Sequence, residues 1–210
     1  MFLKQLQVGY MAVFAYLVGD PETKEGLVID PAAKVDQIID QAEAAGIKIR
    51  YIVNTHSHVD HISGNAEMKS KTGAGIIIHE KDAAALASTP GVMLKMFGAK
   101  ASPPADRTVR EGDTIEVGNV SLQVIHTPGH TPGGMCLYTP GFVFTGDTLF
   151  VGGVGRTDLP GGSWNTMLDS IRTKLLVLPE DTIVLPGHHY GSAPRSTIGL
   201  EKRHNPFLTD

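Results

Sequence analysis

The sequence predicts an α+β fold in which two β-sheets pack face to face, with helices on their outer sides. Segments with a strand pattern outnumber segments with helical spacing, they fall into two groups, and each group has helices attached. Two packed sheets covered by helices would bury all of these apolar surfaces. The 210 residues suit one sizeable domain, and no low-complexity tract or linker divides them. We therefore expect a single domain over residues 1–210.

The first half is predicted to begin with three short strands and then to alternate strands and helices. Asp20-Pro21 marks a turn in an apolar stretch that lacks a signal-peptide cleavage site. Apolar residues at helical spacing follow Asp30-Pro31, and Gly46 can end that helix. The expected elements are strands Phe2–Val8, Ala12–Val18 and Gly26–Ile29, a helix Val35–Ala45, a strand Tyr51–Val53, a helix Asn65–Lys71, a strand Ile76–Ile78 and a helix from about Lys81.

The second half follows the stretch Ser88–Asp106, whose prolines and glycines predict an irregular surface excursion over one rim of the fold. Gly118-Asn119 indicates a hairpin between two strands. The expected elements are strands Ile115–Val117, Val120–Ile125, Met135–Tyr138 and Phe142–Phe144, a glycine-rich loop over 152–162, a helix Trp164–Leu176, a strand Ile183–Leu185, and a last helix capped by Ser196 that ends before Pro206.

Composition and charge exclude several classes of partner. The formal net charge is −4, and no basic run exists to follow a phosphate backbone, so we expect no nucleic-acid partner. No segment reaches the roughly 20 apolar residues that span a bilayer, so we expect no membrane partner. The single cysteine, Cys136, cannot form an internal disulfide, which favours a cytoplasmic location.

Four candidate metal ligands, His56, His58, Asp60 and His61, occupy six positions between a predicted strand and a helix. Imidazole and carboxylate groups are natural ligands of zinc and iron, and alternate positions of an extended segment point to one side. A solvated loop does not explain this concentration in a chain with nine histidines. We expect His56 and His58 to bind at one centre, and Asp60 and His61 to reach a neighbouring one.

Three further candidates, His130, Asp147 and His188, each follow an apolar strand and lie beside glycine. Glycine allows the backbone to turn tightly at such positions. With the first cluster they supply seven ligands, which suits two metal sites that share one carboxylate.

The pattern His-x-His-x-Asp-His at residues 56–61, with the three later residues, resembles the metallo-β-lactamase superfamily over nearly the whole chain. The resemblance implies the metallo-β-lactamase fold, a four-layer αβ/βα sandwich with its metal site at one edge. It also implies how two metals would be held. The first would take His56, His58 and His130, the second would take Asp60, His61 and His188, and Asp147 would bridge both.

Shorter motifs resemble particular branches of this superfamily. The zinc β-lactamases of the best-known class carry a cysteine where Asp147 stands, which argues against a lactamase. The segment Phe144–Phe150 resembles glyoxalase II, the hydroxyacylglutathione hydrolases, while Gly155–Asp158 and Ser196–Leu208 resemble its short bacterial relatives. Full-length glyoxalase II has a C-terminal helical domain, for which the residues after His188 are too few.

Gly155–Asp158 also resembles the persulfide dioxygenases, which bind one iron through counterparts of His56, His130 and Asp147. We therefore expect a metal-dependent hydrolase that cleaves S-acylglutathione to glutathione and an acid through a metal-activated hydroxide. The alternative is a mononuclear iron dioxygenase acting on glutathione persulfide, and a non-catalytic metal-binding module is a third class. Two divalent ions are expected, zinc first, because iron and manganese suit the same ligands.

Several other residues have expected roles. Asp60 and Asp147 are expected to be catalytic by orienting the hydroxide, and Arg156 and Tyr190 are candidates for binding a small thioester or glutathione-derived substrate. Arg156 could instead pair with Asp158 to fix its loop. The remaining expectations are a structural role near the site for His126, a surface position for His79 and His204, and a core position for Cys136. His188 is favoured as the ligand because it directly follows Pro-Gly, although its neighbour His189 could take the same role.

Overall fold

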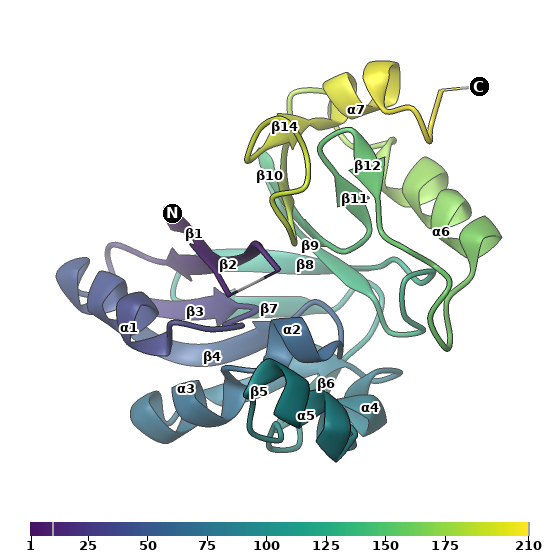
Figure 1. Cartoon of the computed structure of the whole chain (residues 1–210). Coiled ribbons are helices and arrows are strands. Elements are labelled where there is room, and N and C mark those ends of the chain that lie inside the picture. The colour runs from purple at the N-terminus through teal and green to yellow at the C-terminus, as the bar shows by residue number, and fades with distance from the viewer. Residues whose placement is uncertain (10, 210) are drawn as a thin grey trace.

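In the computed structural model, two six-stranded sheets pack face to face and helices lie on their outer sides (Figure 1). The structure describes residues 1–9 and 11–209. This arrangement confirms the fold that the sequence predicts. None of the helices in the described part of the chain is long and apolar enough to cross a membrane.

The first sheet starts as an antiparallel meander and continues with parallel strands. It confirms the three strands predicted at the N-terminus and adds a short edge strand, β6, that was not predicted. Across the sheet the strands are β1 (Phe2–Val8), β2 (Val13–Gly19), β3 (Glu25–Ile29), β4 (Lys48–Asn54), β5 (Gly75–His79) and β6 (Arg107–Val109).

The second sheet has antiparallel strands except for one parallel pair, β10 with β13. The predicted hairpin at Gly118-Asn119 joins its first two strands. Across the sheet the strands are β14 (Ser196–Thr197), β13 (Ile183–Pro186), β10 (Phe142–Gly146), β9 (Met135–Thr139), β8 (Val120–His126) and β7 (Thr114–Val117). A separate ribbon pairs β11 (Leu149–Phe150) with β12 (Gly153–Val154).

Seven α-helices accompany the sheets in the described part of the chain. Gly73 takes a left-handed conformation, with φ 71°, at the end of α3, as its place in the sequence predicts. The helices are α1 (Val35–Ala44), α2 (Val59–Ile62), α3 (Asn65–Thr72), α4 (Ala83–Ala87), α5 (Gly91–Phe97), α6 (Trp164–Ser170), which continues as a π-helical segment over Ile171–Leu175, and α7 (Ile198–His204).

Two details of the prediction are wrong. The stretch Ser88–Asp106 is not irregular throughout, because α5 lies within it; Pro90 and a left-handed Gly98 bound this helix, and such residues mark helix ends as well as loops. The cap of α7 is Thr197 and not Ser196. The Thr197 hydroxyl accepts a hydrogen bond from the Leu200 N–H at 3.2 Å, whereas Ser196 pairs in β14.

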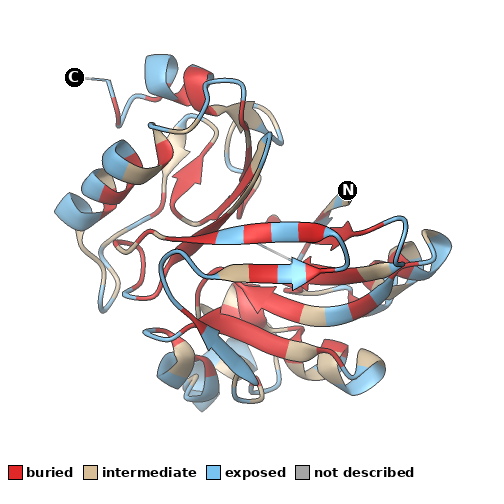
Figure 2. Cartoon of the chain, turned by 180° about the vertical axis from the view of Figure 1, so that it is seen from behind, coloured by how far each residue is buried: buried red, intermediate tan, exposed pale blue. Residues whose placement is uncertain are grey.

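The apolar core has three layers, which follow from the alternation of side chains along each strand. Ala15 and Leu17 of β2 face α1, whereas Tyr16 of the same strand faces the second sheet. There the Tyr16 ring meets the ring of Phe144 edge to face, with centroids 5.1 Å apart. A third layer lies between the second sheet and α6. Figure 2 shows the resulting buried strands between exposed helix faces.

Candidate metal centre

The seven predicted ligands converge at one edge of the sandwich, where several strands end. β3, β4 and β5 are parallel, so their carboxyl ends share this edge of the first sheet. β10 and β13 are also parallel and end together in the second sheet. The ligands come from four places: His56, His58, Asp60 and His61 after β4 and in α2, His130 after β8, Asp147 after β10, and His188 after β13.

The side chains form two groups of three that share no residue, and a third group, His56, His61 and Asp147, spans them. The ligand atoms of His56, His58 and His130 lie within 4.8 Å of one another, as do those of Asp60, His61 and His188. We call these the first and second triads. The closest approach within the first triad is 2.8 Å, between His58 Nδ1 and His130 Nε2. Within the second it is 3.0 Å, between His61 Nε2 and His188 Nε2.

Asp147 lies between the two triads. Its Oδ1 is 3.3 Å from His61 Nε2, and its Oδ2 is 3.5 Å from His130 Nε2 and 3.3 Å from His188 Nε2. Gly187 allows this approach, because a Cβ atom there would lie 2.4 Å from Asp147 Oδ1. One carboxylate thus faces both groups, as a bridging ligand would.

The outer nitrogen of most of these histidines is already held by the protein. His130 Nδ1 donates to the Arg156 carbonyl at 2.6 Å, and His188 Nδ1 donates to the Met11 carbonyl at 2.7 Å. Because a carbonyl oxygen only accepts, Nδ1 carries the proton in both, and Nε2 keeps a lone pair toward the centre. Such outer bonds fix the ring orientation of metal-binding histidines.

Two inward atoms lack a hydrogen-bond partner among the described residues, although both are buried: His56 Nε2 and Asp147 Oδ1. A buried polar atom without a partner is unfavourable unless something else satisfies it. Together with a donor set of five imidazoles and two carboxylates, these atoms fit divalent metal ions.

The electrostatics of the two triads differ. Burial lowers the pKa of His56, and it lowers the pKa of His58 to about 4. Burial also acts against the charged form of His61 and His188, but nearby Asp147 and Asp60 outweigh it. The pKa of His61 therefore lies well above its usual value, and that of His188 rises to about 9.

The two carboxyl groups respond in the opposite sense. Burial would raise the pKa of Asp147 and of Asp60, but His61 and then His188 lower it below the usual value in both cases. Both side chains therefore stay ionised at neutral pH. The second triad consequently combines a negative carboxylate with two basic imidazoles, whereas His56 and His58 of the first triad stay neutral.

Sequence reasoning missed two buried carboxylates beside this centre. Asp30, after β3, has its Oδ2 3.0 Å from His61 Nδ1. Asp82, before α4, accepts hydrogen bonds from Ser57, Thr131 and Gly133. Neither belongs to a histidine-rich motif. The only sequence signal for Asp30 was its place at a strand end, where Asp30-Pro31 was interpreted as a turn.

The two candidate substrate-binding residues lie at the edge of the centre. The Arg156 side chain is exposed and makes two hydrogen bonds to Asp158, at 2.8 and 2.7 Å, while its carbonyl holds His130. The Tyr190 ring stacks on the His188 ring at 4.4 Å, with an interplanar angle of 10°. Burial, followed by Asp147 and Asp60, raises the pKa of Tyr190 to about 12, so its hydroxyl stays protonated.

The other histidines lie outside the ligand groups, and the expectation for His79 is wrong. His79 is buried and stacks on His126, with centroids 4.0 Å apart, because β5 and β8 end close together. His126 Nε2 lies 2.9 Å from the Pro132 carbonyl and so supports the turn of His130. His189 faces Gln7, and His204 is exposed. Cys136 is buried in the core, as predicted, and burial raises the pKa of its thiol to about 11.

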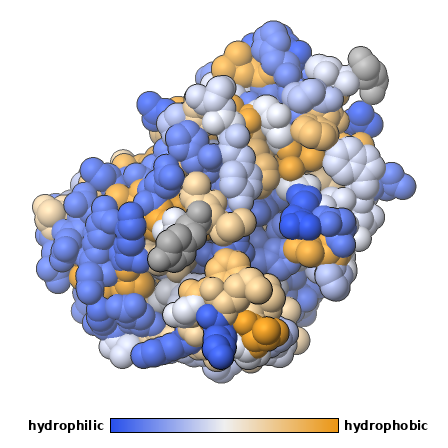
Figure 3. Space-filling model, in the orientation of Figure 1, coloured by the Kyte–Doolittle hydropathy of each residue, from blue (hydrophilic) through white to orange (hydrophobic). Residues whose placement is uncertain are grey.

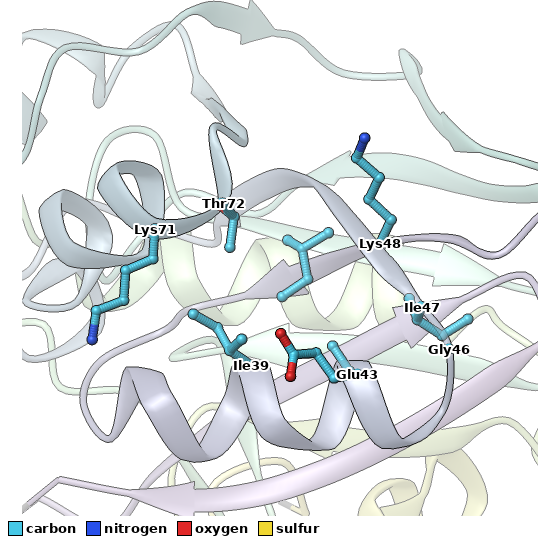
Figure 4. Close-up of a pocket in the computed structure, with 9 residues that line it drawn as sticks. Ile39, Glu43, Gly46, Ile47, Lys48, Lys71 and Thr72 are labelled. Carbon is cyan, nitrogen blue, oxygen red and sulfur yellow. The ribbon is translucent and has the colours of Figure 1, made fainter.

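A groove elsewhere on the surface offers no comparable chemistry. It lies between α1 and the start of β4, and its lining includes Ile39 and Glu43 of α1 together with Lys48 and Thr72 (Figure 4). Its nine lining residues include one carboxylate and no histidine. The groove is at the amino end of β4, whereas the ligands follow its carboxyl end, roughly 20 Å away at the usual rise of a strand.

The excursion helix α5 covers part of the rim. It contacts α2, the helix that carries Asp60 and His61. Figure 3 shows apolar surface where Figure 1 places α5, and its exposed apolar side chains are Val92, Met93 and Met96. A second, smaller gap is too narrow for a water molecule, and it is lined by His56, His130 and Asp147 together with Thr55, Gly134, Met135 and Thr148.

The fold and this centre define a metal-dependent enzyme. Comparison with known proteins identifies its class further. The family model of the metallo-β-lactamase superfamily matches residues 8–188, and the chain belongs to this superfamily. Hydroxyacylglutathione hydrolase GloC of Haemophilus influenzae is 38% identical over 198 residues, which cover 91% of each chain. The mitochondrial persulfide dioxygenase ETHE1 of Homo sapiens is 34% identical over 213 residues, which cover 99% of this chain and 76% of the relative.

Solved structures are similar over the whole length. The B3 metallo-β-lactamase BLEG-1 superposes with a TM-score of 0.89 at 33% identity, covering 100% of both chains. TTHA1623 in a di-iron-bound form superposes with a TM-score of 0.86 at 33% identity, covering 98% of this chain and 100% of the other. Relatives of this chain thus differ in their chemistry, while the fold is common to all.

Proposed function

We propose that the protein hydrolyses S-acylglutathione thioesters to glutathione and a carboxylic acid, as glyoxalase II does. The observation that carries this proposal is the complete second triad of Asp60, His61 and His188. A 2-His-1-carboxylate iron centre needs only three protein ligands. A chain that positions all seven is suited to two metal ions, with Asp147 shared between them.

Two bound divalent ions would act as Lewis acids toward a carbonyl oxygen and would lower the pKa of a water molecule toward neutrality. The protein's own side chains would hold the metal ions and orient the water molecule. The Asp60 side chain is 18% exposed, more than that of Asp147 at 10%, so Asp60 is the carboxylate that better reaches a water molecule. Because both stay ionised, they can accept a hydrogen bond from that water and orient it.

Arg156 and Tyr190 would bind the glutathione part. A guanidinium suits a carboxylate because it donates two parallel hydrogen bonds. In this structure both hydrogen bonds go to Asp158. Asp158 would therefore orient Arg156, and a substrate carboxylate would displace it. Tyr190, stacked on His188, offers a flat face and a protonated hydroxyl. The named activity of the Haemophilus influenzae relative supports this substrate class.

A persulfide dioxygenase is the second candidate, and one observation favours it. The three residues that would hold a single iron, His56, His130 and Asp147, lie together at the centre, with His130 Nε2 3.5 Å from Asp147 Oδ2. The named activity of the human relative supports this candidate equally directly. The two candidates differ in whether the second triad is needed.

The deciding experiment measures thiol release from S-lactoylglutathione and, separately, oxygen uptake with glutathione persulfide. Metal-replete wild-type protein, His188→Ala and Asp147→Ala are compared. A hydrolase releases thiol, and both variants lose this activity. Oxygen uptake that survives in His188→Ala but not in Asp147→Ala would overturn the hydrolase proposal in favour of the dioxygenase.

A further inference from the structure

We infer that Asp82 is a positioning residue that locks together the two loops of the first triad and thereby sets the affinity of the first metal site alone. The inference rests on the proposed two-metal centre. Asp82 makes no hydrogen bond to any of the seven ligand side chains. It lies directly before α4, in a different part of the sequence from every ligand.

The Asp82 carboxylate is buried and accepts three hydrogen bonds. Its Oδ2 accepts from the Ser57 N–H at 2.9 Å and from the Thr131 hydroxyl at 2.9 Å, and its Oδ1 accepts from the Gly133 N–H at 2.6 Å. Three donors for two oxygens satisfy a buried carboxylate, and charge-assisted bonds of this kind are stronger than neutral ones.

The three donors belong to the two loops that carry the histidines of the first triad. Ser57 lies between His56 and His58, and Thr131 directly follows His130. The carboxylate therefore joins the backbone of one ligand loop to the other loop. The ring atoms that this link brings together, His58 Nδ1 and His130 Nε2, are 2.8 Å apart.

Gly133 allows its loop to lie close to Asp82, because glycine has no side chain. A Cβ atom at this position would lie 2.6 Å from both the backbone nitrogen and Oδ1 of Asp82. Real Cβ atoms do not approach so closely, and a buried backbone cannot easily move away. A side chain at position 133 would therefore push the carboxylate out of its place.

Other groups hold the second triad. Asp30 holds His61, and the Met11 carbonyl holds His188. The loss of Asp82 should therefore loosen the first triad while the second keeps its supports. A general weakening of the fold would affect both triads.

The substitution Asp82→Asn keeps the size of the side chain but exchanges one oxygen for an NH2 group. In either orientation of the amide, its NH2 group faces at least one of the three protein donors. At least one of the three hydrogen bonds is therefore lost. The substitution Thr131→Val removes one donor without touching Asp82, and Thr131→Ser keeps the hydroxyl. This pair provides a milder test if the Asp82 variant fails to fold.

The experiment measures Zn²⁺ dissociation constants by competition with a chelator in two single-site backgrounds. His188→Ala leaves the first triad intact, and His58→Ala leaves the second intact. We expect Asp82→Asn to weaken Zn²⁺ binding about tenfold in the His188→Ala background and to leave it unchanged in the His58→Ala background. This is the lower end of the roughly 10–100-fold loss seen when a group bonded directly to a ligand is removed, because Asp82 acts through the loops. Thr131→Val should act in the same sense, and Thr131→Ser should restore wild-type affinity.

Equal weakening in both backgrounds, or no weakening in His188→Ala, would overturn the inference. If Asp82→Asn does not fold, the Thr131 pair decides on the same criteria. Failure of the proposed function is distinguishable, because no substrate is used. If the wild-type protein binds only one Zn²⁺, the two-metal proposal fails, and the effect of Asp82→Asn on that one ion still decides the inference.

Discussion

His61 Nδ1 lies 3.0 Å from Asp30 Oδ2, and both side chains are buried. The same carboxylate accepts the Thr55 N–H at 2.9 Å and the Thr55 hydroxyl at 2.6 Å, and that hydroxyl oxygen lies 3.1 Å from His56 Nδ1. One carboxylate thus orients a histidine of each triad. Asp30 itself has φ 48°, an unfavourable backbone conformation that persists only where the surroundings impose it.

Replacing Asp30 should therefore weaken both metal sites, unlike replacing Asp82. We expect Asp30→Asn to lower the Zn²⁺ affinity of each single-site background by about 10–100-fold. Asp36→Asn is the matched control, because Asp36 is an exposed aspartate on α1 that pairs with Lys71. Chelator competition measures the effect. Weakening confined to one background would show that Asp30 acts on His61 or on His56, but not on both.

Asp147→Ala should remove bound metal and turnover together. The variant takes one ligand from each site, so the loss should exceed the roughly 10–100-fold that follows removal of an outer partner. Elemental analysis and thiol release are measured on the same sample, with the exposed residue Asp158 changed to alanine as a control for metal content. A fully metallated and active Asp147→Ala protein would refute the bridging role.

Metal binding should depend more steeply on pH at the second triad than at the first. Protons compete with metal for Nε2, and the pKa of His188 is raised to about 9, so at least one proton must leave on binding at neutral pH. Zn²⁺ affinity in His58→Ala should therefore rise at least tenfold per pH unit from pH 6 to 8.

The first triad should behave differently over the same range. The pKa of His58 is lowered to about 4 and that of His56 is also lowered, so both rings are already neutral at pH 6. Zn²⁺ affinity in His188→Ala should therefore change less steeply between pH 6 and 8 than in His58→Ala. Calorimetry in buffers of different ionisation enthalpy counts the released protons, and equal slopes in the two backgrounds would contradict this assignment.

Asp20 links the two sheets and should make stability depend on pH in the acid range. Its Oδ2 accepts the backbone and side-chain N–H groups of Asn119, both at 2.9 Å, in the hairpin between β7 and β8. Gly118 permits this contact, because a Cβ atom there would lie 2.6 Å from Asp20 Oδ2. The link joins the β2–β3 turn of the first sheet to the second sheet.

The hydrogen bonds from Asn119 and then Glu22 lower the pKa of Asp20 to about 2. Its unfolded value is about 3.9. The ionised form is thus favoured by folding, so the contribution is complete above about pH 4 and is lost as the pH falls through 2. We expect Asp20→Ala to lower the melting temperature by a few degrees at pH 7, with the difference shrinking below pH 4. A difference that grows on acidification would refute this.

Much of the fold could be predicted because its signals are local. The strand patterns, the hairpin at Gly118-Asn119 and the cluster from His56 to His61 lie in short segments, and all are found in the structure. The more distant ligands were recognisable because each follows a strand beside glycine. Gly146 shows why glycine is needed there, since its φ is 47° and a Cβ atom would lie 2.6 Å from the Thr55 hydroxyl.

The supports of the site were not predictable, because their partners are distant in sequence. Asp30 and Asp82 are single aspartates at element ends, where aspartate is common for purely local reasons. Only the packing shows that Asp82 faces Ser57 and Thr131, and that His79 is covered by His126. The helix α5 was missed because Pro90 and Gly98 are equally typical of a loop.

The central claim is that seven side chains form a two-metal centre. Anomalous diffraction from crystals of the Zn²⁺-loaded protein tests it most directly. The account predicts two peaks, one bound by His56, His58 and His130 and one bound by Asp60, His61 and His188, with Asp147 contacting both. A single peak bound by His56, His130 and Asp147, with the second triad empty at saturating metal, would contradict it.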